Sequence, residues 1–154
     1  MVRLAIDANL PILLVVGSVA RHWIGRHKCL KGFETQDFDL LIEVMEPYAS
    51  VVATPNALTE ASNLIVQGVK EPLRAQLQDK LAQVIKASIE HYVPNCDAVA
   101  NTEFGRSGLT DTAWLCLLDP TTTLLTTDLG LYLAAVHRGF LAQNFNHLRD
   151  GRFS

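Results

Sequence analysis

The chain of 154 residues has the length of a single domain, which we place at residues 1–154. Its hydrophobic fraction of 49% and charged fraction of 19% are those of a globular protein and argue against disorder. The formal net charge of −3 excludes a generally basic protein that coats polyanions. Cys29, Cys96 and Cys116 form no CxxC pair, so we expect free, mostly buried thiols and a cytoplasmic location.

The N-terminal residues predict a strand that runs directly into a helix. Residues 2–6 are short and apolar, as in a central parallel strand, and the apolar run 10–19 follows with almost no loop. A secretory signal is the alternative for this run, but Asp7 and a single preceding basic residue, Arg3, argue against it. The run is also too short to span a bilayer as a helix. We therefore expect a buried first helix and no membrane association.

The next segments continue the alternation of helices and strands. Residues 21–36 are polar and predict a loop or a short broken helix. A helix that begins at Asp37 and ends at Pro47 is predicted because apolar residues recur at i, i+3, i+4 and i+7: Phe38, Leu41, Ile42 and Met45. Residues 50–54 predict a second buried strand, and residues 57–67 predict a third helix.

A long helix over residues 73–92 is predicted next, because one face keeps apolar residues throughout: Leu73, Leu77, Leu81, Val84, Ile85, Ile89 and Tyr92. The remaining residues predict helices at 110–118 and 129–138 and strands at 122–127 and 140–145. Strands that alternate with helices indicate an α/β protein. We expect a three-layer α/β/α sandwich with a central, mostly parallel sheet.

Four acidic residues fall where predicted strands end or predicted helices begin. Asp7 and Asp128 directly follow strands, Glu60 lies in the run TPNALTE after the second strand, and Asp111 begins a helix in GLTD. Three of them have a structural alternative: Asp111 and Asp128 would also suit a helix N-terminus, and Glu60 an exposed first turn. Asp7 is harder to explain in this way, because it lies between an apolar strand and an apolar helix. In open α/β sheets, however, ligands bind outside the carboxyl ends of the strands. Together the four acids predict an acidic site at that edge.

Several carboxylates in one pocket suit a hard divalent cation. Two carboxylates about 4 Å apart repel by roughly 4 kcal/mol at an effective dielectric near 20, so four of them require a cation or must share protons. Mg²⁺ and Mn²⁺ prefer carboxylate and water oxygens, and such ions promote phosphodiester hydrolysis. The sequence has no zinc-type His/Cys spacing, Walker loop or nucleophile elbow that would compete with this assignment.

In order, spacing and context, these four acids resemble those of the PIN-domain ribonucleases, over about residues 2–146. The resemblance implies a PIN-like α/β/α fold and an endoribonuclease that hydrolyses RNA with Mg²⁺ or Mn²⁺. It implies that the catalytic and metal-binding residues are Asp7, Glu60, Asp111 and Asp128. Asn9 and Thr126 match positions where the family often keeps a small polar residue that supports the acids. The chain departs from compact toxin members in the greater length of residues 21–36 and 73–92.

The resemblance to toxin-type members also implies an antitoxin protein as a partner, and with the apolar helix faces it suggests a homodimer. The RNA would need positive charge outside the acidic pocket. Basic residues that would supply it follow the first helix and recur near the C-terminal end: Arg21, Arg26, Lys28, Lys31, Arg138, Arg149 and Arg152. A solvated loop and tail is the alternative for these residues.

Two other functions remain open from the sequence. One is a non-catalytic PIN-like module that binds RNA or acts as a scaffold, although such members usually lose one or more of the acids. The other is a small-molecule phosphohydrolase of a different α/β fold. The aspartate-nucleophile type of that enzyme requires a second Asp at the position of Asn9, which argues against it.

Overall fold

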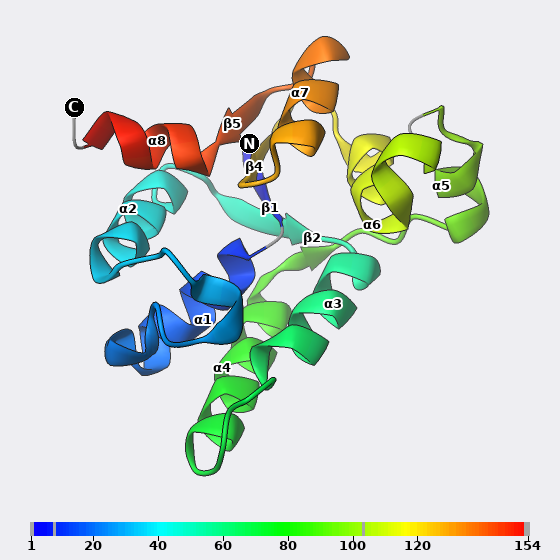
Figure 1. The fold of residues 1–154 in the computed structure, drawn as a ribbon. Coiled ribbons are helices and arrows are strands. Elements are labelled where there is room, and N and C mark those ends of the chain that lie inside the picture. The colour runs from blue at the N-terminus through cyan, green and yellow to red at the C-terminus, as the bar shows by residue number, and fades with distance from the viewer. Residues whose placement is uncertain (1, 8, 103, 153–154) are drawn as a thin grey trace.

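A computed structural model describes residues 2–7, 9–102 and 104–152 and shows a parallel sheet with helices on both faces (Figure 1). The strand order is β3-β2-β1-β4-β5, and every neighbouring pair is parallel. The strands are β1 (Arg3–Ile6), β2 (Ser50–Ala53), β3 (Ile89–Glu90), β4 (Thr122–Thr126) and β5 (Ala142–Asn144). The expected α/β/α sandwich is confirmed, and its sheet is wholly parallel.

The helices follow the strands in the alternation that a parallel sheet requires. They are α1 (Leu10–Val19), α2 (Thr35–Met45), α3 (Pro55–Ile65), α4 (Leu73–Ala87), α5 (Asn95–Ala100), α6 (Phe104–Leu117), α7 (Leu129–His137) and α8 (Phe145–Arg152). Two 3₁₀ turns, η1 (Arg21–Trp23) and η2 (Lys28–Leu30), lie between α1 and α2. Among the described residues, no helix combines the length and the apolar character needed to cross a bilayer.

The sheet separates two clusters of buried side chains. Along β1, Leu4 and Ile6 belong to the cluster formed with α1 to α4, whereas Ala5 belongs to the cluster with α6 and α7. Helix α1 is buried from Leu10 to Gly17, so its uniformly apolar sequence reflects burial on all sides. Gly17 lies against the Phe38 ring of α2, which leaves no room for a side chain at this crossing.

The prediction of one helix over residues 73–92 is wrong beyond Ala87. Ser88 is extended, with ψ of 155°, and its hydroxyl donates to the Val84 carbonyl, which ends α4. Ile89 and Glu90 then pair with β2 as an edge strand. The apolar periodicity is misleading here because Ile89 and Tyr92 are not on a helix and are 42% and 76% exposed. Helix α5, which follows, was not predicted.

Element boundaries shift elsewhere for local reasons. Glu34 rather than Asp37 is the N-cap of α2, and Asp37 at the third position completes a capping box. The last predicted strand shortens to β5, because Asn144 Oδ1 accepts hydrogen bonds from the Asn146 and His147 amides and starts α8. That helix was not predicted either.

The three cysteines are free, as expected. Cys29 is half-buried, whereas Cys96 on α5 and Cys116 on α6 are exposed, so the expectation of mostly buried thiols is wrong for two of them. Both lie on solvent-facing sides of helices whose buried faces carry Ala98 and Trp114.

Candidate functional site

The four predicted acids come from four elements that meet at the carboxyl edge of the sheet. Asp7 follows β1 at the centre of the sheet, and Asp128 follows the neighbouring strand β4. Glu60 lies in the second turn of α3, which starts directly after β2, and α6 supplies Asp111 (Figure 1). Asp7, Asp128 and Glu60 all act electrostatically on the Asp111 carboxyl, so the acids form one cluster around it.

Asp7 is the buried base of this acidic cluster, with 3% of its surface exposed. Its Oδ1 accepts a hydrogen bond of 2.6 Å from the Trp114 indole Nε1, and its Oδ2 accepts one of 3.3 Å from Thr126 Oγ1. These two hydrogen bonds hold the Asp7 carboxyl group in one orientation.

Thr126 links Asp7 to Asp128. Its hydroxyl donates to Asp7 and accepts a 3.0 Å hydrogen bond from the Asp128 backbone amide. Asp128 in turn caps α7, because its Oδ1 accepts from the Leu131 amide at 3.0 Å. Asp128 is therefore an N-cap and a member of the acidic cluster at once. Asn9 occupies the N-cap position of α1, but its side chain makes no capping hydrogen bond.

Gly108 determines where Asp111 sits. Helix α6 consists of two helical pieces separated at Gly108, whose φ of 79° and ψ of 179° are outside the range of a helix. Positive φ is a conformation that glycine adopts readily and other residues rarely do. The second piece therefore starts just before Asp111, which places this carboxyl in a first turn, where the helix dipole favours negative charge.

Burial and the mutual repulsion of the acids raise the pKa of Asp111. Burial, the neighbouring charges of Asp7, Asp128 and Glu60, and a hydrogen bond with the Asp128 carboxyl raise the pKa of Asp111 from 3.8 to about 7. Glu60 is exposed at the rim, whereas Asp111 and Asp128 are half-buried. The cluster thus has more negative charge than its own hydrogen bonds compensate, and a bound cation would relieve it.

The donor chemistry of the cluster fits Mg²⁺ or Mn²⁺, since both ions take carboxylate oxygens. The geometry fits less closely. Within residues 2–7, 9–102 and 104–152, no three acidic, histidine or cysteine side chains converge as a group that could hold a metal ion. These carboxylates would therefore have to move closer together to hold a metal ion, and Asp128 Oδ1 is already engaged as a cap.

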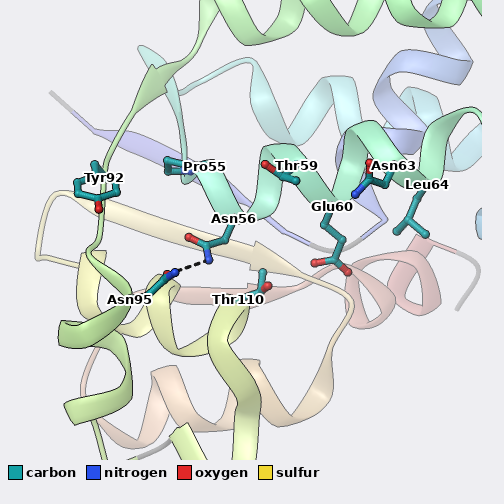
Figure 2. Close-up of a pocket in the computed structure, with 9 residues that line it drawn as sticks. All are labelled: Pro55, Asn56, Thr59, Glu60, Asn63, Leu64, Tyr92, Asn95 and Thr110. Carbon is teal, nitrogen blue, oxygen red and sulfur yellow. Dashed lines mark hydrogen bonds between the residues drawn. The ribbon is translucent and has the colours of Figure 1, made fainter.

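A groove of about 750 Å³ opens beside Glu60, between α3 and the segment from β3 to α6 (Figure 2). Among the described residues, its lining contains three asparagines and an exposed tyrosine and no lysine or arginine: Pro55, Asn56, Thr59, Glu60, Asn63, Leu64, Tyr92, Asn95 and Thr110. Asn56 Nδ2 donates to Asn95 Oδ1 at 3.4 Å across the groove. Figure 2 shows Tyr92 and Glu60 toward opposite ends of this row.

The predicted basic rim is not brought to the acids. Arg21, Arg26 and Lys28 lie in the segment that follows α1, and that helix runs away from the carboxyl edge over about 15 Å (Figure 1). Arg26 and Lys28 are exposed. Arg21 forms a two-pronged ion pair with Asp39, at 2.9 and 3.1 Å.

The C-terminal arginines make structural contacts. Arg138 donates to Asn101 Oδ1 and to Thr102 Oγ1. Arg149 pairs with the buried Asp37 at 3.0 Å, which ties α8 to α2. The side chain of Arg152 lies outside the described residues.

Sequence reasoning missed Trp114 and the groove residues other than Glu60. Trp114 stands three positions after Asp111 on the predicted helix, but its indole bonds to Asp7 across 107 positions, a contact that the spacing does not indicate. Asn56, Glu60 and Asn63 share one face of α3 at i, i+4 and i+7. Tyr92 was missed because residues 88–92 were assigned to a helix.

Comparison with known proteins leaves the family open. No protein-family model matches the chain, and no curated protein matches it.

Proposed function

We propose that the chain is a metal-dependent endoribonuclease that hydrolyses RNA phosphodiester bonds with Mg²⁺ or Mn²⁺. The observation that carries the proposal is the gathering of Asp7, Glu60, Asp111 and Asp128 at the carboxyl edge, where their mutual repulsion helps to raise the pKa of Asp111 to about 7. Such a shift marks an arrangement that stability alone does not favour.

The roles of the side chains follow from their burial and contacts. Asp7 is held in place by Trp114 and Thr126 and would be the fixed metal ligand. Asp111, Asp128 and Glu60 would complete the ligand set from the more open side of the cluster. A divalent ion held there would supply a Lewis acid and lower the pKa of a bound water. Asp111 protonates near neutrality without metal and would release its proton when a cation binds.

RNA cleavage with Asp7→Asn as the inactive variant tests the proposal. Asparagine keeps an oxygen for the Trp114 indole, and its amide can donate to Thr126 Oγ1, so the variant should fold. We expect the wild-type protein to cut a pool of single-stranded and structured RNAs with Mn²⁺ but not with a chelator. Asp7→Asn should be inactive, whereas Asp79→Asn, which removes an exposed acid of α4, should cut normally. Absence of cleavage by a folded wild-type protein across metals and RNAs would refute the proposal.

A non-catalytic RNA-binding or scaffold module is the second candidate. The observation that favours it is that no three potential ligands converge as a metal-binding group among the described residues. A calorimetric titration that measures Mn²⁺ binding distinguishes the two candidate functions. Binding that is lost in Asp7→Asn favours the nuclease, and RNA binding without any metal binding favours the module.

The antitoxin and dimer partners are also part of this proposal. For a toxin, induced expression of the wild type should arrest bacterial growth, and expression of Asp7→Asn should not. A second copy of the chain would suit the apolar strip on α7, where Leu129, Leu133 and Val136 recur at i, i+4 and i+7 and are 54%, 54% and 46% exposed. Leu133→Glu should then yield a monomer in sedimentation. If the wild-type protein is a monomer at the same concentration, the proposed homodimer is rejected.

A further inference from the structure

The groove beside Glu60 has a chemistry that the acidic cluster does not explain. Its lining joins three elements: Asn56, Glu60 and Asn63 from α3, Tyr92 and Asn95 from the β3–α5 segment, and Thr110 from α6 (Figure 2). The groove opens directly onto Glu60, which lies four residues or about 6 Å along α3 from Asn56. A ligand that lies in the groove therefore contacts Glu60, the exposed member of the acidic cluster.

The lining selects against phosphate as the group held in the groove. Phosphate contacts rely on arginine, lysine and backbone amides, and the groove has neither basic residue, while Glu60 adds a negative charge. Carboxamides instead offer a donor and an acceptor side by side, the pattern that matches the polar edge of a nucleobase. The hydrogen bond from Asn56 to Asn95 orients both amides and uses only one position on each.

Tyr92 supplies the second feature of a base site, an accessible aromatic face. Its side chain is 76% exposed, the highest value among the large hydrophobic side chains of the described residues. Aromatic rings that bind single strands stack on bases of any sequence, and this stacking contributes substantially to affinity. Nothing in the packing of the described chain requires a tyrosine at so exposed a position.

We infer that this groove binds unpaired bases of an RNA strand, with Tyr92 as the stacking platform and Asn56, Asn63 and Asn95 as partners for base edges. The inference rests on the proposed function, since it takes RNA to be the substrate whose phosphate meets the acidic cluster. The substrate is then single-stranded at this point, because in a duplex the base faces are stacked and the pairing edges are occupied. In this inference the groove recognises the RNA, and the carboxylates catalyse its cleavage.

Equilibrium binding in the presence of a chelator tests the groove without cleavage. The probes are fluorescent single-stranded RNA oligonucleotides of each base and a duplex RNA of equal length. We expect Tyr92→Ala to weaken binding of single strands about tenfold, and Tyr92→Phe, which keeps the ring, to bind like the wild type. Asn56→Ala and Asn95→Ala should weaken binding to some bases more than to others. Two controls outside the groove, Phe104→Ala and Gln78→Ala, should have no effect.

Several outcomes would overturn the inference. They are unchanged binding by Tyr92→Ala and Asn56→Ala, a preference of the wild type for duplex RNA, and no binding of any probe. Each variant is also tested for cleavage with Mn²⁺, which separates this inference from the proposed function. If the groove variants bind RNA normally and cleave it with metal, the groove inference is rejected and the proposed nuclease function stands. If the groove variants bind RNA more weakly but the wild-type protein never cleaves, the groove inference stands and the nuclease function is rejected.

Discussion

Trp114 donates its indole Nε1–H to Asp7 Oδ1 at 2.6 Å, across 107 positions of sequence. Both residues are buried, with exposures of 0% and 3%. Trp114 also belongs to the hydrophobic cluster of α6, α7 and β4, so its ring is held by packing on one side while its nitrogen serves the acidic cluster. The core under the sheet edge therefore orients the carboxylate that we place at the centre of the site.

The first prediction concerns this hydrogen bond. Trp114→Phe removes the donor from a buried carboxylate, and hydrogen bonds to charged groups are worth about 1.5–3 kcal/mol. We expect a loss of at least that free energy of unfolding in urea, because the smaller ring also leaves a void. A double-mutant cycle with Asp7→Ala, which removes the acceptor as Trp114→Phe removes the donor, isolates the pair. Trp23→Phe, at a half-buried tryptophan, serves as the control, and a coupling energy near zero would contradict the assignment.

The second prediction is a pH dependence of stability in the metal-free protein. The pKa of Asp111 is raised to about 7 in the folded chain, against the ordinary value of 3.8 that applies once the chain unfolds, so the folded state binds the proton more tightly. The favourable contribution is full below about pH 4 and is lost as the pH rises through 7. Urea unfolding across this window should show wild-type stability falling relative to Asp111→Asn. Parallel curves for the two proteins would show that Asp111 does not carry the shift.

The third prediction concerns cations. A ligand that binds only the folded state stabilises it, by about 2.7 kcal/mol at a concentration 100-fold above its Kd. For a chain of this size that corresponds to a rise in Tm of roughly 5–10 °C. We expect Mn²⁺ to raise the Tm of the wild type and of Asp79→Asn, and a chelator to reverse the rise. Asp111→Asn and Asp128→Asn should show a smaller rise. An equal rise in all four proteins would indicate non-specific binding.

The acidic cluster could be placed from the sequence because it depends on a rule of topology. Once Asp7 and Asp128 are assigned to the ends of parallel strands, their meeting at one edge follows. Helix α1 could also be predicted, because a helix buried on all sides has a uniformly apolar sequence. Both features could be predicted because they follow from patterns within short segments of the sequence.

The features that could not be predicted depend on contacts between distant segments. Strand β3 has two residues and exists through its pairing with β2, which overrides the helical periodicity of Ile89 and Tyr92. The hydrogen bond between Asp7 and Trp114 depends on how α6 packs under the sheet edge. The groove likewise requires α5, which has only six residues and no apolar repeat long enough to detect.

The last prediction compares two arginines that the sequence placed in one basic rim. Arg149 pairs with Asp37, whose side chain is 5% exposed, donates to the Gly32 carbonyl and lies 4.5 Å from the centre of the Phe33 ring. Arg149→Ala leaves Asp37 as a buried charge without this partner, so we expect a loss of about 3 kcal/mol in the free energy of unfolding. Arg21→Ala breaks a pair whose side chains are 48% and 50% exposed, and it should cost far less because water screens both charges. Urea unfolding of both variants decides the matter: equal losses would mean that burial does not distinguish the pairs. If Arg149→Ala were as stable as the wild type but bound RNA more weakly, Arg149 would be assigned to RNA binding, as the sequence predicts.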